Sequence, residues 1–130
     1  MKPLYLASQS PRRLQLLEQL GLQPTLMTPE PHEDAEALEV VSPGEAPSTY
    51  VQRVTRLKLD ASLRRMKWLG WPAGVVLCAD TTVAQGRQIL GKPDSPAHAL
   101  AMLQGLQGHT HRVLTCVAVG TLSRQQQCLQ

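Results

Sequence analysis

The sequence predicts an α/β domain, because short apolar runs typical of buried strands alternate along it with longer stretches of helical periodicity. The apolar runs are residues 3–7, 75–79 and 113–119, and the helical stretches begin near residues 10, 47 and 95. The chain has 130 residues, of which 42% are hydrophobic and 18% are charged. This is enough for one core, so residues 1–130 are predicted to form a single domain.

Composition narrows the class of ligand and the compartment. The formal net charge is +3, and the chain has two Trp, two Tyr and no Phe. A mildly basic chain without clustered cations or stacking aromatic residues suits a small anionic ligand and predicts no nucleic-acid partner. Cys78, Cys116 and Cys128 show no CxxC spacing, which favours reduced thiols, the first two in the core. No apolar run approaches a membrane span, so we expect a cytoplasmic protein with no membrane partner.

The first helix is predicted to begin at a site suited to anions. Ser10 is a natural N-cap, Pro11 fits the first helical position, and Gly21 lies just past the end. The first turn carries Arg12 and Arg13, where acidic residues are usual. With the free N–H groups of a helix start, these arginines would attract a phosphate. Two solvated arginines are the alternative.

Residues 24–47 contain five prolines and an acidic patch, which predict an exposed loop with at most a short helical turn. Glu33 or Asp34 could reach a metal ion or the base of a substrate. Solvated loop carboxylates are the alternative.

A second helix is predicted to open at Pro47 or Ser48. Its apolar stripe is expected at Tyr50, Val54, Leu57 and Ala61. Lys58 lies on a flank of this stripe, so its amine either extends into solvent or points into a cleft at the edge of the core. Residues 64–72 are expected to form a linker.

The stretch from Val75 to Pro93 places an acid and a base close together in sequence. The strand predicted at residues 75–79 should end at Asp80, and ligands of α/β proteins bind beyond the carboxyl ends of strands. Residues 85–86 predict a hairpin turn, and Lys92 follows it. Such an acid could act on water and such a lysine on a phosphate ester. An aspartate that merely starts a turn is the alternative.

The last third of the chain is predicted to add a helix and a strand. Ser95 and Pro96 signal the helix start, and its buried face is expected at Ala99, Met102, Leu103 and Leu106. His109 and His111 lack a companion ligand at metal spacing, so we expect a polar loop entering the strand at 113–119. The last ten residues would suit the beginning of a return strand.

Several separated motifs follow one another in order. They are Ser8-Gln9-Ser10-Pro11-Arg12-Arg13, Tyr50-Val51 with Arg53 and Lys58, Ala79-Asp80-Thr81, Gly91-Lys92-Pro93, and Gly108 with His111. Together they resemble the Maf family of nucleoside triphosphate pyrophosphatases, from about Leu4 to about Leu129. The resemblance implies a Maf-like (ITPase-like) α/β fold, with a mixed sheet flanked by helices and a cleft between two lobes.

The resemblance also implies an activity and a site. The activity is hydrolysis of a nucleoside triphosphate to the monophosphate and pyrophosphate, with a divalent cation, Mg²⁺ or Mn²⁺. Asp80 would be the general base, and the substrate would be bound by Ser8, Ser10, Arg12, Arg13, Lys58, Thr81 and Lys92. Glu33 falls where the family carries a site glutamate, so Glu33 and Asp80 are the expected metal ligands. A homodimer is a further expectation.

Arg12 and Thr81 are similar to the branch of the family that acts on dTTP and UTP, whereas the branch acting on 7-methyl-GTP differs at both places. The expected substrates are therefore dTTP and UTP. Family members continue beyond Gln130, so the chain is expected to hold the N-terminal portion of the fold and to lack the C-terminal part. A truncated, non-catalytic nucleotide-binding or interaction module is the alternative function.

Overall fold

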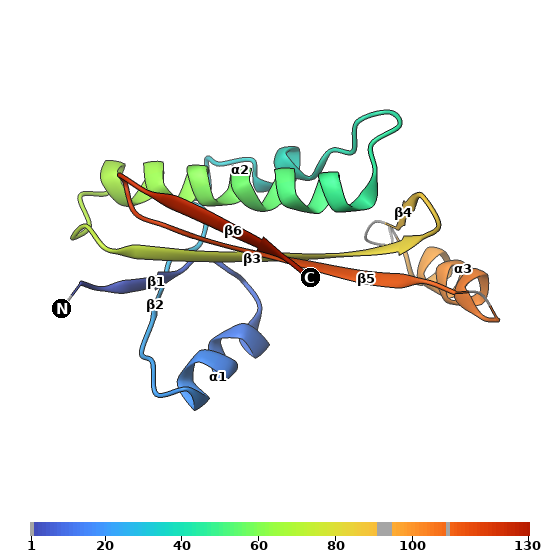
Figure 1. Cartoon of the computed structure of the whole chain (residues 1–130), viewed down its shortest axis with the longest axis horizontal. Helices are drawn as coiled ribbons and strands as arrows, with labels where there is room; N and C mark the ends of the chain where they lie inside the picture. The colour runs from blue at the N-terminus through green and yellow to red at the C-terminus, as the bar shows by residue number, and fades with distance from the viewer. Residues whose placement is uncertain (1, 91–94, 109) are drawn as a thin grey trace.

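The computed structural model describes residues 2–90, 95–108 and 110–130. Its elements, in chain order, are β1 (Leu4–Leu6), α1 (Pro11–Gln19), β2 (Thr25–Leu26), the 3-10 helix η1 (Ala35–Glu39), α2 (Pro47–Trp68), β3 (Val75–Gln85), β4 (Gln88–Leu90), α3 (Pro96–Leu106), β5 (Arg112–Gly120) and β6 (Gln125–Leu129). They form a mixed α/β fold (Figure 1), which confirms the predicted fold class.

The sheet is parallel at one side and antiparallel at the other. Within the described residues its strand order is β2-β1-β3-β5-β6, and β4 pairs with the far end of β3. β1 runs parallel to β2 and β3, whereas β4, β5 and β6 join by antiparallel pairing. β1 pairs with β3 only as far as Leu77, and β4 begins to pair at Val83. Among the described strands, the part of β3 between these two points has a neighbour on the β5 side alone.

β3 is longer than the sequence predicted, and this changes the setting of Asp80. The strand was expected to end at Ala79, where the apolar run stops. It continues to Gln85, because β5 pairs with it along Val76–Ala84. The prediction that Asp80 lies beyond a strand end is therefore wrong: it lies in mid-strand, beside the gap that β1 leaves.

α2 covers one face of the sheet, and α1 lies on the opposite side (Figure 1). The predicted start at Pro47 is confirmed. The buried stripe is displaced from the predicted one, because Leu57 and Ala61 are only partly buried. It consists mainly of Val51, Val54, Thr55, Leu59, Ser62, Leu63 and Met66. Since this burial continues past residue 64, the expectation of a linker at 64–72 is wrong for its first half.

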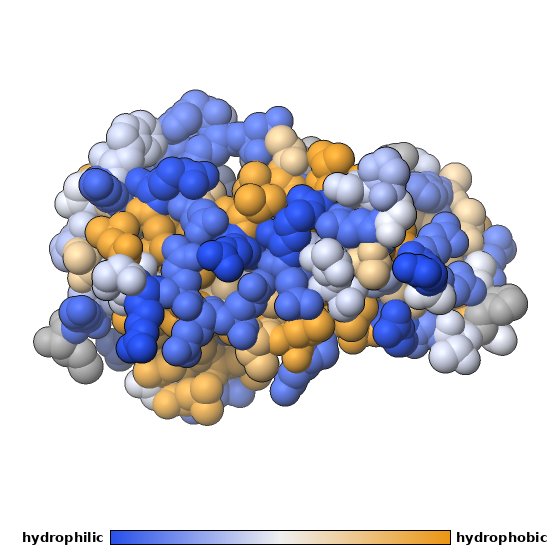
Figure 2. Space-filling view, turned by 45° about the horizontal axis from the view of Figure 1, so that its top comes forward, coloured by the Kyte–Doolittle hydropathy of each residue, from blue (hydrophilic) through white to orange (hydrophobic). Residues whose placement is uncertain are grey.

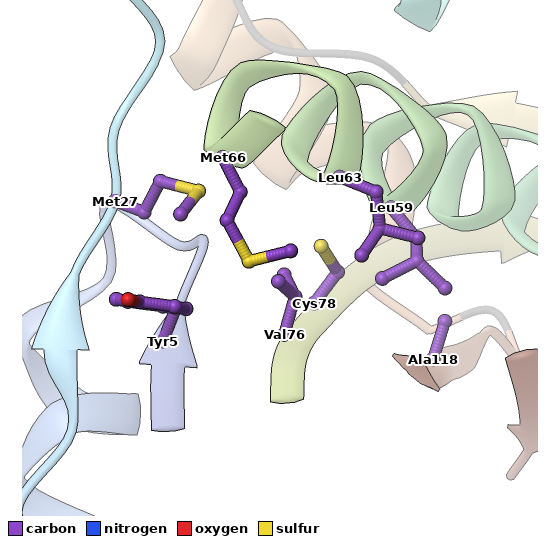
Figure 3. Packing of buried hydrophobic residues seen from close by; sticks show 8 residues of the cluster. All are labelled: Tyr5, Met27, Leu59, Leu63, Met66, Val76, Cys78 and Ala118. Atoms are coloured by element: carbon purple, nitrogen blue, oxygen red, sulfur yellow. The ribbon is translucent and has the colours of Figure 1, made fainter. Parts of the chain in front are cut away.

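The core lies between α2 and the centre of the sheet, and Figure 3 shows its cluster: Tyr5, Met27, Leu59, Leu63, Met66, Val76, Cys78 and Ala118. In a chain without Phe, flexible Met side chains fill the space that rings would occupy. Cys78 and Cys116 are buried and free, as predicted. Burial raises the pKa of the Cys78 thiol to about 11, so it packs as a neutral group.

α1 and α3 are peripheral. Both begin as predicted, with Pro in the first turn after Ser10 and Ser95. The buried face predicted for α3 is wrong: none of its residues is buried, because the helix lies beyond the end of the sheet that β4 forms (Figure 1). Apolar side chains also remain at the surface, as the orange areas of Figure 2 show. On α1 and directly after it, Leu16 is 53% exposed and Leu20 is 75% exposed. The predicted return strand is confirmed as β6.

Within the described residues, no helix combines the length and the hydropathy needed to cross a bilayer.

Candidate active site

A hollow of about 850 Å³ opens beside the gap in the pairing of β3. Its walls come from the loop between β1 and α1, the segment of residues 29–39, the middle of α2, and residues 79–81 of β3. Volumes of this order are typical of pockets that bind a small ligand. We call it the main hollow.

The loop after β1 supplies one wall. Ser8 is almost buried, and its hydroxyl accepts hydrogen bonds from Ser10 N at 3.2 Å and from Arg13 Nη1 at 3.0 Å. Arg13 Nη2 also donates to Thr81 Oγ1 at 3.3 Å. Arg13 thus connects the start of α1 to β3, and its charge adds to the N-terminal end of the helix dipole. An anion is favoured at this end of the hollow.

Asp80 is held by its own strand. Its Oδ1 accepts a hydrogen bond from the backbone N–H of Thr81 at 3.1 Å, and its Oδ2 lies 3.5 Å from Lys58 Nζ. The side chain is 20% exposed. Thr81 is the next residue of the strand, so its side chain points to the face of the sheet opposite to that of Asp80. Its hydroxyl lies 3.0 Å from that of Thr115. The carboxylate is therefore fixed in direction but accessible from the hollow.

Of the two orientations that the sequence allowed for Lys58, into solvent or into a cleft, the structure shows the second, because the side chain lines the main hollow. Its Nζ donates to Glu39 Oε1 at 2.7 Å and lies near Asp80. Burial disfavours the charged amine, but the hydrogen bond to Glu39 and the charge of Asp80 outweigh it, so the pKa of Lys58 is raised. The lysine is a cation at neutral pH, placed between two carboxylates.

Glu33 lies in the wall formed by residues 29–39, where its carboxylate pairs with Arg65. Arg65 Nε lies 2.6 Å from Glu33 Oε2, and Arg65 Nη2 lies 2.7 Å from Oε1. The backbone N–H of Glu30 donates to Oε2 as well, at 2.9 Å. The hydrogen bonds from Arg65 outweigh burial and, with the bond from Glu30, lower the pKa of Glu33 to about 2.

This lowered pKa predicts how the Glu33–Arg65 pair responds to acid. A carboxylate with a depressed pKa in the folded state stabilises the protein above its unfolded pKa, near 4.5, and loses that contribution as the pH falls toward about 2. The stability difference between the wild type and Glu33→Gln should therefore shrink across that range. Urea unfolding at several pH values measures it. A difference that stays constant down to pH 2 would contradict the assignment.

The structure brings most of the predicted site residues together. Those lining the main hollow are Ser8, Ser10, Arg13, Glu33, Lys58, Asp80 and Thr81. Arg12 is exposed and is not part of the lining. Lys92 lies outside the described residues. The roles of these residues stay predictions.

Among the charged residues that line the hollow, sequence reasoning did not single out Glu30, Glu39, Arg64 and Arg65. Arg65 was placed in a linker, although the helical period of α2 continues through it. Glu39 belonged to an acidic patch in which nothing distinguished one carboxylate from the next. Its role depends on the approach of η1 to Lys58, across 19 residues of sequence.

The carboxylates that line the main hollow do not form a preformed cage for a divalent cation among the described residues. Among the described residues, no group of three or more His, Cys, Asp or Glu side chains gathers to hold a metal ion. Mg²⁺ is usually bound by one or two carboxylates together with phosphate oxygens and water. Asp80 fits that donor set, whereas both oxygens of Glu33 are already bound by Arg65.

Known proteins resemble this chain in structure and in sequence. A crystal structure titled nucleoside-triphosphatase, or dITP/XTP pyrophosphatase, from Mycobacterium abscessus matches with a TM-score of 0.48 and 17% identity, covering 98% of this chain and 69% of that one. Among curated proteins, one named dTTP/UTP pyrophosphatase from Albidiferax ferrireducens is 60% identical over 126 residues, which are 97% of this chain and 63% of the relative.

A protein of the same name from Cupriavidus metallidurans is 55% identical, with the same two coverages, 97% and 63%. One from a Polaromonas species is 61% identical over 88% of this chain and 57% of its own length. The chain thus spans about three fifths of the length of these relatives. The family model described as Maf-like protein matches residues 3–130, and the chain therefore belongs to the Maf family.

Proposed function

We propose that this protein hydrolyses dTTP and UTP to the nucleoside monophosphate and pyrophosphate. The relatives at 55–61% identity carry the name dTTP/UTP pyrophosphatase. One observation on this chain carries the proposal. The Asp80 carboxylate shares the main hollow with the cationic side chains of Lys58 and Arg13, which come from different elements.

The triphosphate would lie along the cationic side of the hollow. Arg13, the hydroxyl groups of Ser8 and Ser10 and the N-terminus of α1 suit the phosphates at one end. Lys58 is close enough to Asp80 to hold a phosphate oxygen next to the carboxylate. Thr81, at the same edge, supports the pyrimidine assignment through the family resemblance. Arg12 and Lys92 complete the proposed set.

The reaction needs a water molecule activated next to the α-phosphorus. The Asp80 carboxylate would accept a proton as the water oxygen bonds to that phosphorus. The bond between the α-phosphorus and the α–β bridging oxygen breaks, and its electron pair leaves with pyrophosphate. Lys58 and Arg13 offset the charge that grows on the phosphate oxygens. A divalent cation held by Asp80 and the phosphates would add further charge neutralisation.

A direct test measures pyrophosphate release and nucleotide binding on the same preparation. Release from dTTP and UTP, well above that from 7-methyl-GTP, would support the proposal. Binding of dTTP by isothermal titration without any release would favour a non-catalytic nucleotide-binding module. A clear preference for 7-methyl-GTP would contradict the substrate assignment.

Glu39 should compete with the substrate for Lys58. Since Lys58 Nζ lies 2.7 Å from Glu39 and 3.5 Å from Asp80, its closest charged partner in the free protein is Glu39. Glu39→Gln should release the lysine and remove a negative charge, which we expect to lower the Kd for dTTP by about two- to fivefold, as for a partly exposed ion pair. Isothermal titration measures it.

The matched control is Glu18→Gln, because Glu18 is exposed on α1 and is not part of the lining. It should leave the affinity for dTTP unchanged. Weaker binding by Glu39→Gln would show that Glu39 orients Lys58 for the substrate instead of competing for it.

The remaining expectations on partners and compartment are also proposals. A mild net charge of +3 supports a free nucleotide over nucleic acid as the ligand. Exposed leucines on the α1 side support association of two copies. The free cysteines, of which Cys78 and Cys116 are buried, are compatible with a cytoplasmic location.

A further inference from the structure

We propose that Arg65 is a positioning residue, which through its ion pair with Glu33 anchors the wall of residues 29–39 to α2 while Lys58 turns to the substrate. The kinetic part of this inference rests on the proposed function, but the anchoring itself does not.

Two ion pairs hold the wall against α2. Glu33, before η1, binds Arg65, and Glu39, at the end of η1, binds Lys58. The two cations are seven residues apart on α2, which puts them on one face of the helix, two turns from each other. Residues 33–39 are therefore bound to α2 at both of their ends.

The Lys58–Glu39 and Arg65–Glu33 ion pairs differ in strength. Lys58 makes one hydrogen bond to Glu39, and both side chains are about one quarter exposed. Arg65 makes two, its side chain is 4% exposed, and its Nη1 also donates to Ser62 Oγ at 3.4 Å. A bidentate, buried guanidinium holds its partner in one geometry, which a partly exposed ammonium with a single hydrogen bond does not.

The wall is rigid on the Glu33 side as well. Glu33 Oε2 accepts from the backbone N–H of Glu30, and Glu33 N donates to Glu30 O at 2.9 Å, which closes a turn. Next to it, Asp34 Oδ1 accepts from Ala37 N and caps η1. Fixing the Glu33 carboxylate thus fixes the turn and the start of η1.

The substrate would break one of the two pairs. If Lys58 moves to a phosphate oxygen, the Glu39 carboxylate loses its cationic partner. The hydrogen bond from the Tyr50 hydroxyl to the backbone carbonyl of Glu39, at 3.0 Å, does not depend on Lys58 and remains. The Glu33–Arg65 pair does not involve a group proposed to bind phosphate. It therefore keeps the wall in place during the exchange, so its loss should affect substrate binding more than the chemical step.

The test uses Arg65→Lys, Arg65→Met and Glu33→Gln in the full chain. Arg56→Met is the matched control, because Arg56 is exposed on the same helix and does not line the hollow. We expect Arg65→Met to raise the KM for dTTP by about tenfold with kcat within about twofold, the pattern of lost uniform binding. Arg65→Lys should recover part of the loss. Adding Glu33→Gln to Arg65→Met should cost little more, because both changes break one interaction.

A second measurement does not need the nucleotide. Amide hydrogen exchange of residues 30–39 should accelerate in all three variants and stay at the wild-type rate in Arg56→Met. If dTTP neither binds nor reacts, the proposed function fails, and this exchange still decides the anchoring. Unchanged exchange would overturn it.

Other outcomes also contradict the inference. An equal fall in kcat and kcat/KM would place Arg65 in the chemistry instead. If Glu33→Gln alone raised the Mg²⁺ concentration needed for half-maximal rate, Glu33 would be a metal ligand rather than the partner of an anchor. A variant that lowers only the melting temperature, with KM unchanged, would reduce the pair to general stability.

Discussion

Asp80→Asn should abolish most of the pyrophosphate release from dTTP while dTTP still binds. An asparagine keeps the shape of the side chain and an oxygen that can accept from Thr81 N, but it cannot take a proton from water. Loss of a general base lowers the rate by about 10²–10⁴-fold. Removing a negative charge beside Lys58 should leave the affinity for the triphosphate equal or slightly higher. Steady-state release of pyrophosphate and isothermal titration measure the two effects.

Asp60→Asn is the control, because Asp60 lies on α2 near Lys58 in sequence but does not line the main hollow. It should retain wild-type turnover. Full turnover in Asp80→Asn would remove Asp80 from the mechanism. Loss of binding together with turnover would mean that the carboxylate holds the site together rather than acting on water.

Leu59→Ala should lower the free energy of unfolding by about 2–5 kcal/mol. Leu59 is 1% exposed and belongs to the cluster between α2 and the sheet, with Cys78 and Ala118 (Figure 3). Truncation would leave a cavity that the paired strands β3 and β5 cannot close without breaking their register. Urea unfolding followed by circular dichroism measures the change.

Leu16→Ala provides the comparison, because Leu16 on α1 is 53% exposed. We expect a change within about 0.5 kcal/mol, as for surface positions away from packed features. Equal losses in the two variants would show that α1 buries Leu16 in solution and that the fold is more compact on that side than described.

The parts of the fold that sequence predicts well are those with local signals. Helix starts at Pro11, Pro47 and Pro96 follow from the fixed φ of proline, which acts within one turn, and Ser95 adds a side-chain cap to the third helix. The end of β3 has no such signal. Asp80 and Thr81 interrupt the apolar run, yet the strand continues because β5 provides pairing from more than 30 residues away. The prediction of a buried face on α3 was wrong because a helical period indicates which residues share a face, but not whether another element covers that face.

The candidate site shows the same division between local and distant information. Serine and arginine at a helix start, in a strand–loop–helix setting, predict an anion site from local sequence, and the hollow contains Ser8, Ser10 and Arg13. The pairing of Glu33 with Arg65 spans 32 residues and depends on how the proline-rich segment folds back on α2. Charge alone could not choose Arg65 over its neighbour Arg64, since only the packing of α2 decides which one is buried.

The gap in the pairing of β3 gives the two edges of this strand different roles. One edge pairs with β5 and holds the sheet together, whereas the open edge borders the main hollow. The ladder with β5 spans nine residue pairs, from Val76 to Ala84, so it sets the register of the strand whatever lies on the open side. A substitution at position 81, on the open side, should therefore leave the register of the strand unchanged. If the proposed function holds, the contacts offered to a nucleotide at this position can change while the backbone around it stays the same.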